Sequence, residues 1–330
     1  YFLLTHIICF NTITFICGAV VFRISGMEYY FLLCMFFVVR MSTDRVEEER
    51  IIGGRYAKKG EFPYAVVISY RPFSSSCGGG ILSPLYVLTA CHCTVTVTEP
   101  FGGLPERKNG DYSNTRVVAG SLARDFPHDQ GYQLRWVFRW MQHPKCKRLL
   151  TGEWIYDISV IQVASPFFFN ELVQPILIPT IQYKLFQIVK LYQVVQRTCH
   201  VAGWGFTVAR GSRREKYFNA SKYLKALAIR LLPPFYCNML LCEYSRFYKC
   251  IENFALETPD RLCAATKHSR AGTICGGDSG SALVCGGVAV GVVSYSSGCT
   301  LLDDPVVYAR IDKSFDFISK YYIHSPNYIG

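Results

Sequence analysis

The stretch Cys275-Gly276-Gly277-Asp278-Ser279-Gly280-Ser281 sets a serine between an aspartate and a glycine, and Ser294-Tyr295-Ser296 follows it. Glycine tolerates the positive φ and the close backbone approach of a tight turn. Such a turn leaves backbone N–H groups free to point at a developing oxyanion. Taken alone, a Gly/Ser run is more often an ordinary loop. In a suitable context it predicts an exposed nucleophile, Ser279.

Three other motifs supply that context. They are Ile51-Ile52-Gly53-Gly54 after Arg50, Leu88-Thr89-Ala90-Cys91-His92-Cys93, and Tyr156-Asp157-Ile158-Ser159-Val160. Their order, with histidine before aspartate before serine, resembles the chymotrypsin/trypsin-like serine protease family over residues 51 to 322. The resemblance implies an all-β fold of two six-stranded antiparallel barrels with a C-terminal helix and an active site in the cleft between them.

The resemblance also implies roles for single residues. Ser279 would attack the scissile carbonyl, His92 would take and return the proton, and Asp157 would orient the imidazole. The N–H groups of Gly277 and Ser279 would form the oxyanion hole. Arg50 would be the activation cleavage site, and the new ammonium of Ile51 would pair with buried Asp278. The pocket positions would be Thr273, Ser294, Ser296 and Val306.

Four disulfides follow from the same resemblance: Cys77–Cys93, Cys199–Cys285, Cys237–Cys263 and Cys275–Cys299. Cys242 and Cys250 are left over in an insertion and can pair locally. Cys91 stands where the family has an alanine, and it is either a buried thiol or bonded to Cys146; the sequence leaves both open. Fifteen cysteines without any C-x-x-C pair indicate disulfides and an oxidising compartment. We therefore expect a secreted protein without a metal or cofactor.

The predicted pocket floor is Thr273, where trypsin-like members have an aspartate that pairs with arginine or lysine. Val306 and Ser296 stand at wall positions that are glycine in open pockets. Because no charge is present to offset a buried guanidinium, we predict cleavage after small or medium apolar side chains. A shifted register that brings Asp303 or Asp304 to the pocket would change this prediction.

Composition and charge limit the kinds of binding partner that we expect. Half of the residues are hydrophobic and the net charge is +11, but no basic helix, zinc knuckle or RNA-binding signature is present, so nucleic acid is not expected. The expected partners are polypeptide substrates, an activating trypsin-like protease and protein protease inhibitors, for a monomeric enzyme. A sequon at Asn219 predicts N-glycosylation. The alternatives are a catalytically weak homologue that acts as a binding protein, and a membrane-tethered protease.

The chain before Ile51 divides into three expected segments. Residues 1–26 are interpreted as an upstream extension, or alternatively as a membrane anchor; residues 27–42 as a signal peptide, from the apolar run after Met27; and residues 43–50 as a short activation propeptide. The protease domain would then cover residues 51–330.

Past residue 63, short β runs are broken by turns without intervening amphipathic helices, which favours an all-β barrel or sandwich. The expected strand runs are 65–70, 80–88, 116–118, 132–141, 158–163, 200–203, 224–232, 262–265, 281–296 and 306–310. The stretch between Cys93 and Arg116 is predicted to be a long loop beside the catalytic histidine. Residues 312–322 are predicted to form one helix with Phe315, Ile318 and Tyr322 facing inward.

Overall fold

The computed structural model describes residues 3–10, 13–24, 27–37, 54–70, 76–98, 106–109, 112–124, 131–149, 152–206, 220–244, 259–266, 272–296 and 305–322. The chain divides into two compact units, residues 1–48 and residues 49–330. The first unit is a three-stranded antiparallel sheet of β1 (Leu3–Phe10), β2 (Ile13–Ile24) and β3 (Met27–Phe37). The expected extension (residues 1–26) and signal peptide (27–42) fall on this unit, the expected propeptide (43–50) lies outside the described residues, and all three stay predictions.

The second unit begins with a closed six-stranded barrel in the order β10-β11-β14-β7-β6-β5. All its neighbouring strands run antiparallel. Its strands are β5 (Ala65–Ser69), β6 (Ser76–Ser83), β7 (Tyr86–Thr89), β10 (Arg116–Ala119), β11 (Gln133–Gln142) and β14 (Ser159–Val163). The predicted run 80–88 is thus the inner part of a hairpin, because Pro84 interrupts it between two strands.

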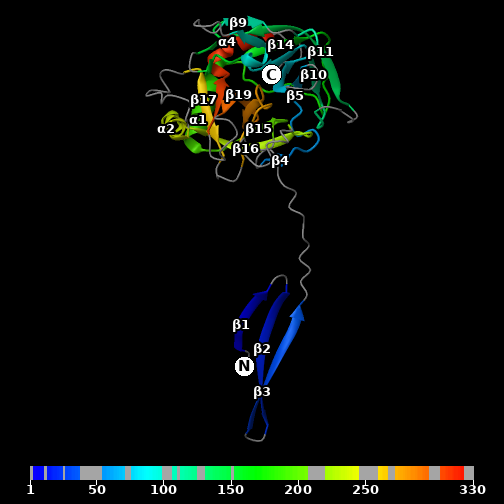
Figure 1. Cartoon of the computed structure of the whole chain (residues 1–330), viewed down its shortest axis with the longest axis vertical. Helices are drawn as coiled ribbons and strands as arrows, with labels where there is room; N and C mark the ends of the chain where they lie inside the picture. The colour runs from blue at the N-terminus through cyan, green and yellow to red at the C-terminus, as the bar shows by residue number, and fades with distance from the viewer. Residues whose placement is uncertain are drawn as a thin grey trace. The chain divides into compact units, whose positions relative to one another are not determined.

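The second barrel follows in the order β15-β18-β19-β20-β17-β16, and the pairing of β15 with β16 closes it. Its strands are β15 (Thr198–Gly203), β16 (Lys225–Leu232), β17 (Arg261–Ala265), β18 (Ala282–Cys285), β19 (Val288–Ser296) and β20 (Val306–Arg310). A short strand, β4 (Arg55–Tyr56), joins β16 from outside. Gly286 and Gly287 turn the predicted run 281–296 into two strands. The two expected six-stranded barrels are confirmed (Figure 1).

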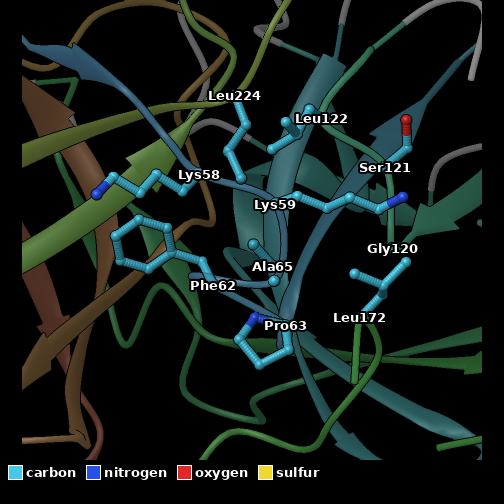
Figure 2. Close-up of a pocket in the computed structure, with 11 residues that line it drawn as sticks. Lys58, Lys59, Phe62, Pro63, Ala65, Gly120, Ser121, Leu122, Leu172 and Leu224 are labelled. Atoms are coloured by element: carbon cyan, nitrogen blue, oxygen red, sulfur yellow. The ribbon is translucent and has the colours of Figure 1, made fainter. Parts of the chain in front are cut away.

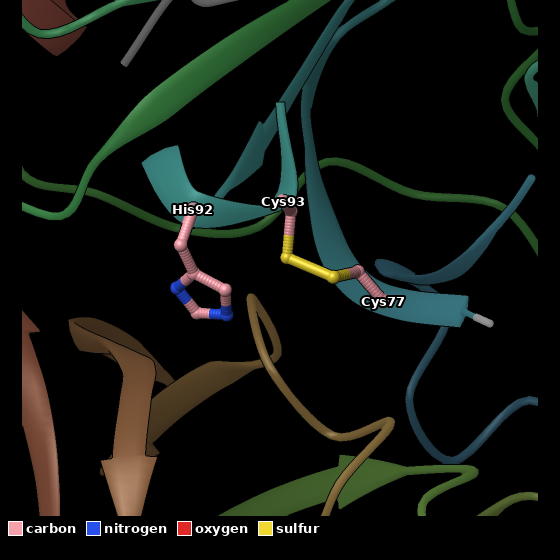
Figure 3. A group of neighbouring side chains, drawn as sticks. All are labelled: Cys77, His92 and Cys93. Carbon is pink, nitrogen blue, oxygen red and sulfur yellow. A yellow bond between two sulfur atoms is a disulfide. The ribbon is translucent and has the colours of Figure 1, made fainter. Parts of the chain in front are cut away.

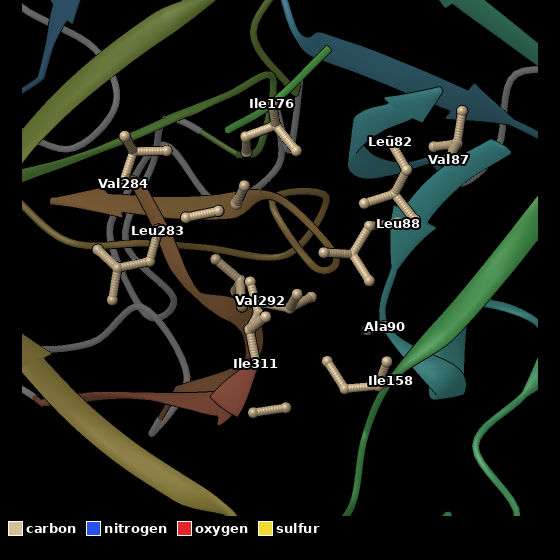
Figure 4. Close-up of a cluster of buried hydrophobic side chains, with 14 of the residues drawn as sticks. Leu82, Val87, Leu88, Ala90, Ile158, Ile176, Leu283, Val284, Val292 and Ile311 are labelled. Carbon is tan, nitrogen blue, oxygen red and sulfur yellow. The ribbon is translucent and has the colours of Figure 1, made fainter. Parts of the chain in front are cut away.

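One hydrophobic core joins the two barrels. Leu82, Leu88 and Ile158 from the first barrel and Leu283 and Val292 from the second belong to the same buried cluster (Figure 4). Burying such side chains contributes about 1.5–3 kcal/mol each. The two barrels are therefore fixed against each other, and so are the loops that each one sends to the space between them.

Two helices that the sequence did not predict lie between the strands of the second unit. Helix α1 (Gln182–Val195) lies against β16, and helix α2 (Pro234–Tyr244) contacts β17. In α1 the buried side chains Leu185, Val189 and Gln193 recur every four residues. Its outer face also carries apolar side chains, so the sequence shows no clear polar stripe there.

The remaining connections also refine the predictions. Within the expected long loop after Cys93, β8 (Val95–Thr98) and β9 (Glu106–Asn109) pair as a hairpin. Two further short strands, β12 (Lys147–Arg148) and β13 (Trp154–Ile155), pair before β14. The C-terminal helix consists of η3 (Asp312–Ser314), α4 (Phe315–Ile318) and η4 (Ser319–Tyr321). Phe315, Ile318 and Tyr322 are buried, as predicted.

Disulfides tie the loops to this scaffold. Within the described residues, bonds join Cys77 to Cys93, Cys91 to Cys146, Cys199 to Cys285 and Cys237 to Cys263. The Cys91–Cys146 bond selects one of the two states that the sequence left open. Cys275 is also disulfide-bonded, and its expected partner Cys299 lies outside the described residues.

Candidate active site

The turn after β7 brings His92 to Asp157. The short helix η1 (Cys91–Cys93) carries the histidine, and Asp157 precedes β14, which pairs with β7. The backbone N–H of His92 donates to Asp157 Oδ1 at 2.9 Å, and His92 Nδ1 lies 2.7 Å from Asp157 Oδ2. Asp157 is 1 % exposed. One carboxylate thus fixes both the backbone and the ring of His92.

Electrostatics makes this histidine more basic than usual. Burial by itself lowers the pKa of His92, but the negative charge of Asp157 and its hydrogen bond outweigh burial and raise the pKa above its ordinary value. The Trp154 ring lies 6.0 Å from the His92 ring, centroid to centroid. Sequence reasoning missed this aromatic neighbour, because Trp154 lies in a segment without a motif.

The second barrel holds the other side of Asp157. The Ser294 hydroxyl, on β19, donates to Asp157 Oδ2 at 2.5 Å. The next residue, Tyr295, accepts a hydrogen bond at its hydroxyl from Arg261, and Arg261 forms a buried ion pair with Glu153 at 2.6 Å. Ser294 was predicted as a substrate-binding residue, and in the structure its side chain orients Asp157.

The loop of Ser279 is held between both barrels. The Ser279 carbonyl accepts a hydrogen bond from the Gly78 N–H of β6 at 2.7 Å, and the Gly280 N–H donates to Val293 O of β19 at 2.9 Å. At Gly280 φ is +84°, and a Cβ there would lie 2.2 Å from Thr89 Oγ1 and 3.1 Å from Ala90 N. Only glycine fits this approach, which brings the loop against the strand end that leads to His92.

Two backbone donors of this loop point at no protein group. Gly277 has a φ of +96°, and among the described residues neither its N–H nor the N–H of Ser279 has a hydrogen-bond acceptor. Free neighbouring N–H groups are what an oxyanion hole needs. Within the same residues the Ser279 hydroxyl makes no hydrogen bond, so its bond to the His92 ring is not formed in this structure.

Asp278 is fully buried beside the nucleophile. The Gly205 N–H donates to its Oδ1 at 2.7 Å and the Cys275 N–H donates to its Oδ2 at 3.1 Å. Burial raises the pKa of Asp278 to about 6, although these two hydrogen bonds lower it in part. Two neutral donors therefore do not fully compensate the buried charge. Arg50 and Ile51, the predicted activation residues, lie outside the described residues, as does Asn219.

The predicted pocket residues lie on three segments, namely the stretch before Ser279, β19 and β20. Thr273 is buried, and its hydroxyl has no hydrogen-bond partner among the described residues. Ser296 and Val306 face each other in the register of β19 and β20, and Val306 is buried. Asp303 and Asp304 lie outside the described residues.

His92 and Asp157 each belong to a group of side chains that could be metal ligands. One comprises Cys77, His92 and Cys93, and the other Cys91, Cys146 and Asp157. In both groups the cysteine sulfurs are bonded to each other, as Figure 3 shows for Cys77 and Cys93. A cysteine that binds a metal would have to be a thiolate, so the cysteines of both groups have a structural role as disulfides.

A shallow pocket with an empty volume of about 300 Å³ lies elsewhere on the second unit (Figure 2). Lys58 and Lys59 line it together with apolar side chains such as Leu172 and Leu224. None of its lining residues belongs to the predicted site. Within the described chain no helix combines the length and the apolar character that crossing a membrane requires.

Comparison with known proteins agrees with this fold. The family model for trypsin matches residues 51–318. Trypsin 5G1 of the mosquito Aedes aegypti is 28 % identical over 272 residues, which cover 82 % of this chain and 84 % of the mosquito protein. The chain belongs to the chymotrypsin/trypsin-like family of serine proteases.

Proposed function

We propose that this protein is a secreted serine endopeptidase, made as a zymogen and activated by cleavage after Arg50. Its triad is His92, Asp157 and Ser279. The observation that carries the proposal is the pair of hydrogen bonds from His92 to buried Asp157, beside a serine loop in which the N–H groups of Gly277 and Ser279 have no acceptor among the described residues. The disulfides support secretion, because such bonds persist in oxidising compartments.

The reaction follows from this arrangement. Ser279 Oγ attacks the scissile carbonyl while His92 Nε2 takes its proton, and Asp157 stabilises the imidazolium that forms. The N–H groups of Gly277 and Ser279 then stabilise the oxyanion, at about 3 kcal/mol for each donor. His92 returns the proton to the leaving amine, and water releases the acyl group by the same steps. The reaction needs no cofactor.

The absent bond between Ser279 and His92 fits an uncleaved zymogen. In the intact chain residue 51 has no free ammonium, and among the described residues the hydrogen-bond donors to Asp278 are the backbone N–H groups of Gly205 and Cys275. A new Ile51 ammonium would supply the missing counter-charge to this carboxylate. Movement of Asp278 toward it would carry the neighbouring Ser279 to the His92 ring.

The proposed substrates are polypeptides cleaved after small or medium apolar residues. Thr273 offers an uncharged hydroxyl and Val306 fills space at the pocket, so neither compensates the charge of an arginine or lysine. An activating trypsin-like protease is the expected partner, because cleavage after Arg50 needs basic specificity that this pocket lacks.

The test is a peptide-library cleavage profile of the Arg50-cleaved protein beside its Ser279→Ala variant. We expect cleavage after alanine, valine or leucine in the parent and at least roughly a thousandfold loss in the variant, because removing a nucleophile ordinarily costs that much. Cleavage after arginine would retain the triad and contradict the pocket assignment. Absence of hydrolysis that depends on Ser279 would instead favour a binding homologue.

A further inference from the structure

The turn from His143 to Cys146, between β11 and β12, contacts the neighbours of both His92 and Asp157. The Cys146 N–H donates to His143 O at 2.9 Å and closes the turn. The Lys145 N–H donates to His143 Nδ1 at 3.1 Å. Both His143 and Cys146 are buried, so this turn is a fixed part of the first barrel.

One end of the turn reaches the histidine of the site. Cys146 is bonded to Cys91, the residue directly before His92. Cys91 is fully buried, and its carbonyl accepts hydrogen bonds from both the N–H and the hydroxyl of Thr94. The disulfide therefore connects the turn to the backbone that carries the imidazole.

The other end reaches the aspartate. The His143 ring stacks on the Tyr156 ring, with centroids 4.9 Å apart and planes 9° apart. The Lys145 ammonium lies 5.3 Å from the centroid of the same ring. Tyr156 directly precedes Asp157, and the His143 N–H donates to the carbonyl of Ile158, which directly follows it.

Tyr156 needs such support because its backbone is unusual. Its φ is +45°, a conformation that costs a bulky residue about 1–3 kcal/mol and persists only when its surroundings hold it. Its N–H donates to Asp260 Oδ2 at 2.6 Å. The stack on His143 and this bond hold Tyr156, and through it the peptide of Asp157, in one position.

We propose that the turn from His143 to Cys146 is a positioning element for catalysis. It holds the backbone before His92 and the backbone before Asp157 through one short segment. The imidazole and the carboxylate are thereby fixed relative to each other. We call Cys91, His143, Cys146 and Tyr156 the brace. The inference rests on the proposed roles of His92 and Asp157. The disulfide and the ring stack attach the brace to the backbone next to His92 and next to Asp157, so its four members act as positioning residues.

The first test compares two variants of Tyr156. Tyr156→Asn removes the ring but keeps a residue that tolerates positive φ, whereas Tyr156→Phe keeps the ring and serves as the control. We expect Tyr156→Asn to lower kcat at least roughly tenfold with little change in KM, because small misplacements of catalytic groups are costly. Tyr156→Phe should behave as the parent. Parent-like kcat in Tyr156→Asn would overturn the proposal.

The second test removes the Cys91–Cys146 disulfide of the brace. The double variant Cys91→Ala with Cys146→Ala should also lose at least roughly tenfold in kcat. Cys199→Ala with Cys285→Ala, which removes a disulfide between β15 and β18, should keep kcat within about twofold. Equal losses in both pairs would mean that the Cys91–Cys146 bond acts only on stability, which contradicts the proposal.

A readout that needs no turnover separates this inference from the proposed function. In a Ser279→Ala background, NMR follows the titration of the His92 imidazole, assigned by its loss in His92→Gln. Asp157 is the charged group that raises the pKa of this ring. Tyr156→Asn should lower that pKa and Tyr156→Phe should not. If the parent shows no hydrolysis, the proposed function fails, and an unchanged titration in Tyr156→Asn would overturn the brace independently.

Discussion

Asp157 is the charged residue that determines the direction of the pKa shift of His92. Burial lowers its pKa, the charge and hydrogen bond of Asp157 raise it, and the net effect is a rise. A base with a raised pKa stays protonated to higher pH and is then unable to accept the Ser279 proton. The loss of activity at acid pH should therefore depend on the interaction between His92 and Asp157.

We predict that kcat/KM of the activated protein falls on the acid side with an apparent pKa above the ordinary histidine value of about 6.5. Asp157→Asn should move this limb to lower pH, because the amide keeps the shape and removes the charge, and it should lower the maximum rate. The measurement is a pH profile with an uncharged peptide substrate. Asp316→Asn, which changes an exposed carboxylate on α4, is the control, and an equal shift in both variants would contradict the assignment.

At the scale of elements, helix α1 packs on the second barrel through one of its faces. Leu185 and Val189 are fully buried in the common core, and Gln193 donates to the carbonyl of Leu232 at 3.3 Å. The helix ends at Gln196, whose left-handed conformation and backbone N–H bond to Tyr192 O close its last turn. The side-chain amide of Gln196 donates a hydrogen bond to Leu231 O of β16. The outer face contributes little to this attachment.

We predict that Leu185→Ala lowers the free energy of unfolding by about 2–5 kcal/mol, since it leaves a cavity under the helix. Val194→Ala, at a position that is 79 % exposed, should change it by less than about 0.5 kcal/mol. Urea unfolding with the disulfides intact measures both. Similar losses in the two variants would show that the outer face of α1 is also packed.

At the scale of the whole molecule, burial of the Asp278 carboxylate costs stability. Its pKa of about 6 lies above the ordinary aspartate value, so the folded state holds a proton that the unfolded state has released. Stability is then unaffected below about pH 4 and falls as the pH rises through about 6. A rise of about two in the pKa corresponds to roughly 3 kcal/mol. Cleavage after Arg50 would relieve this cost.

We predict that the uncleaved Ser279→Ala protein loses about 3 kcal/mol of stability between about pH 4 and pH 7, beyond what the same protein carrying Asp278→Asn loses. Denaturant unfolding across this pH range measures the difference. Cleavage after Arg50 should raise the stability of the protein that retains Asp278 at about pH 7 and leave that of the Asp278→Asn variant nearly unchanged. Parallel pH curves for the two uncleaved proteins would contradict the role of Asp278 in activation.

The sequence by itself indicated the family, and the resemblance to that family implied the two barrels and the residues of the candidate site. Those features rest on local patterns, namely motifs around His92, Asp157 and Ser279 and short β runs between turns, and each pattern is readable from neighbours in the chain. The inward face of the C-terminal helix was predictable for the same reason, because Phe315, Ile318 and Tyr322 recur at helical spacing.

Only the tertiary structure decided how distant residues combine. Helix α1 was missed because its outer face is also apolar, so the periodicity that marks a surface helix is weak. The partner of Cys91, the bond from Ser294 to Asp157 and the stack of His143 on Tyr156 join residues 13 to 137 positions apart. Such contacts depend on how the barrels pack, since packing, rather than local sequence, sets which side chains meet.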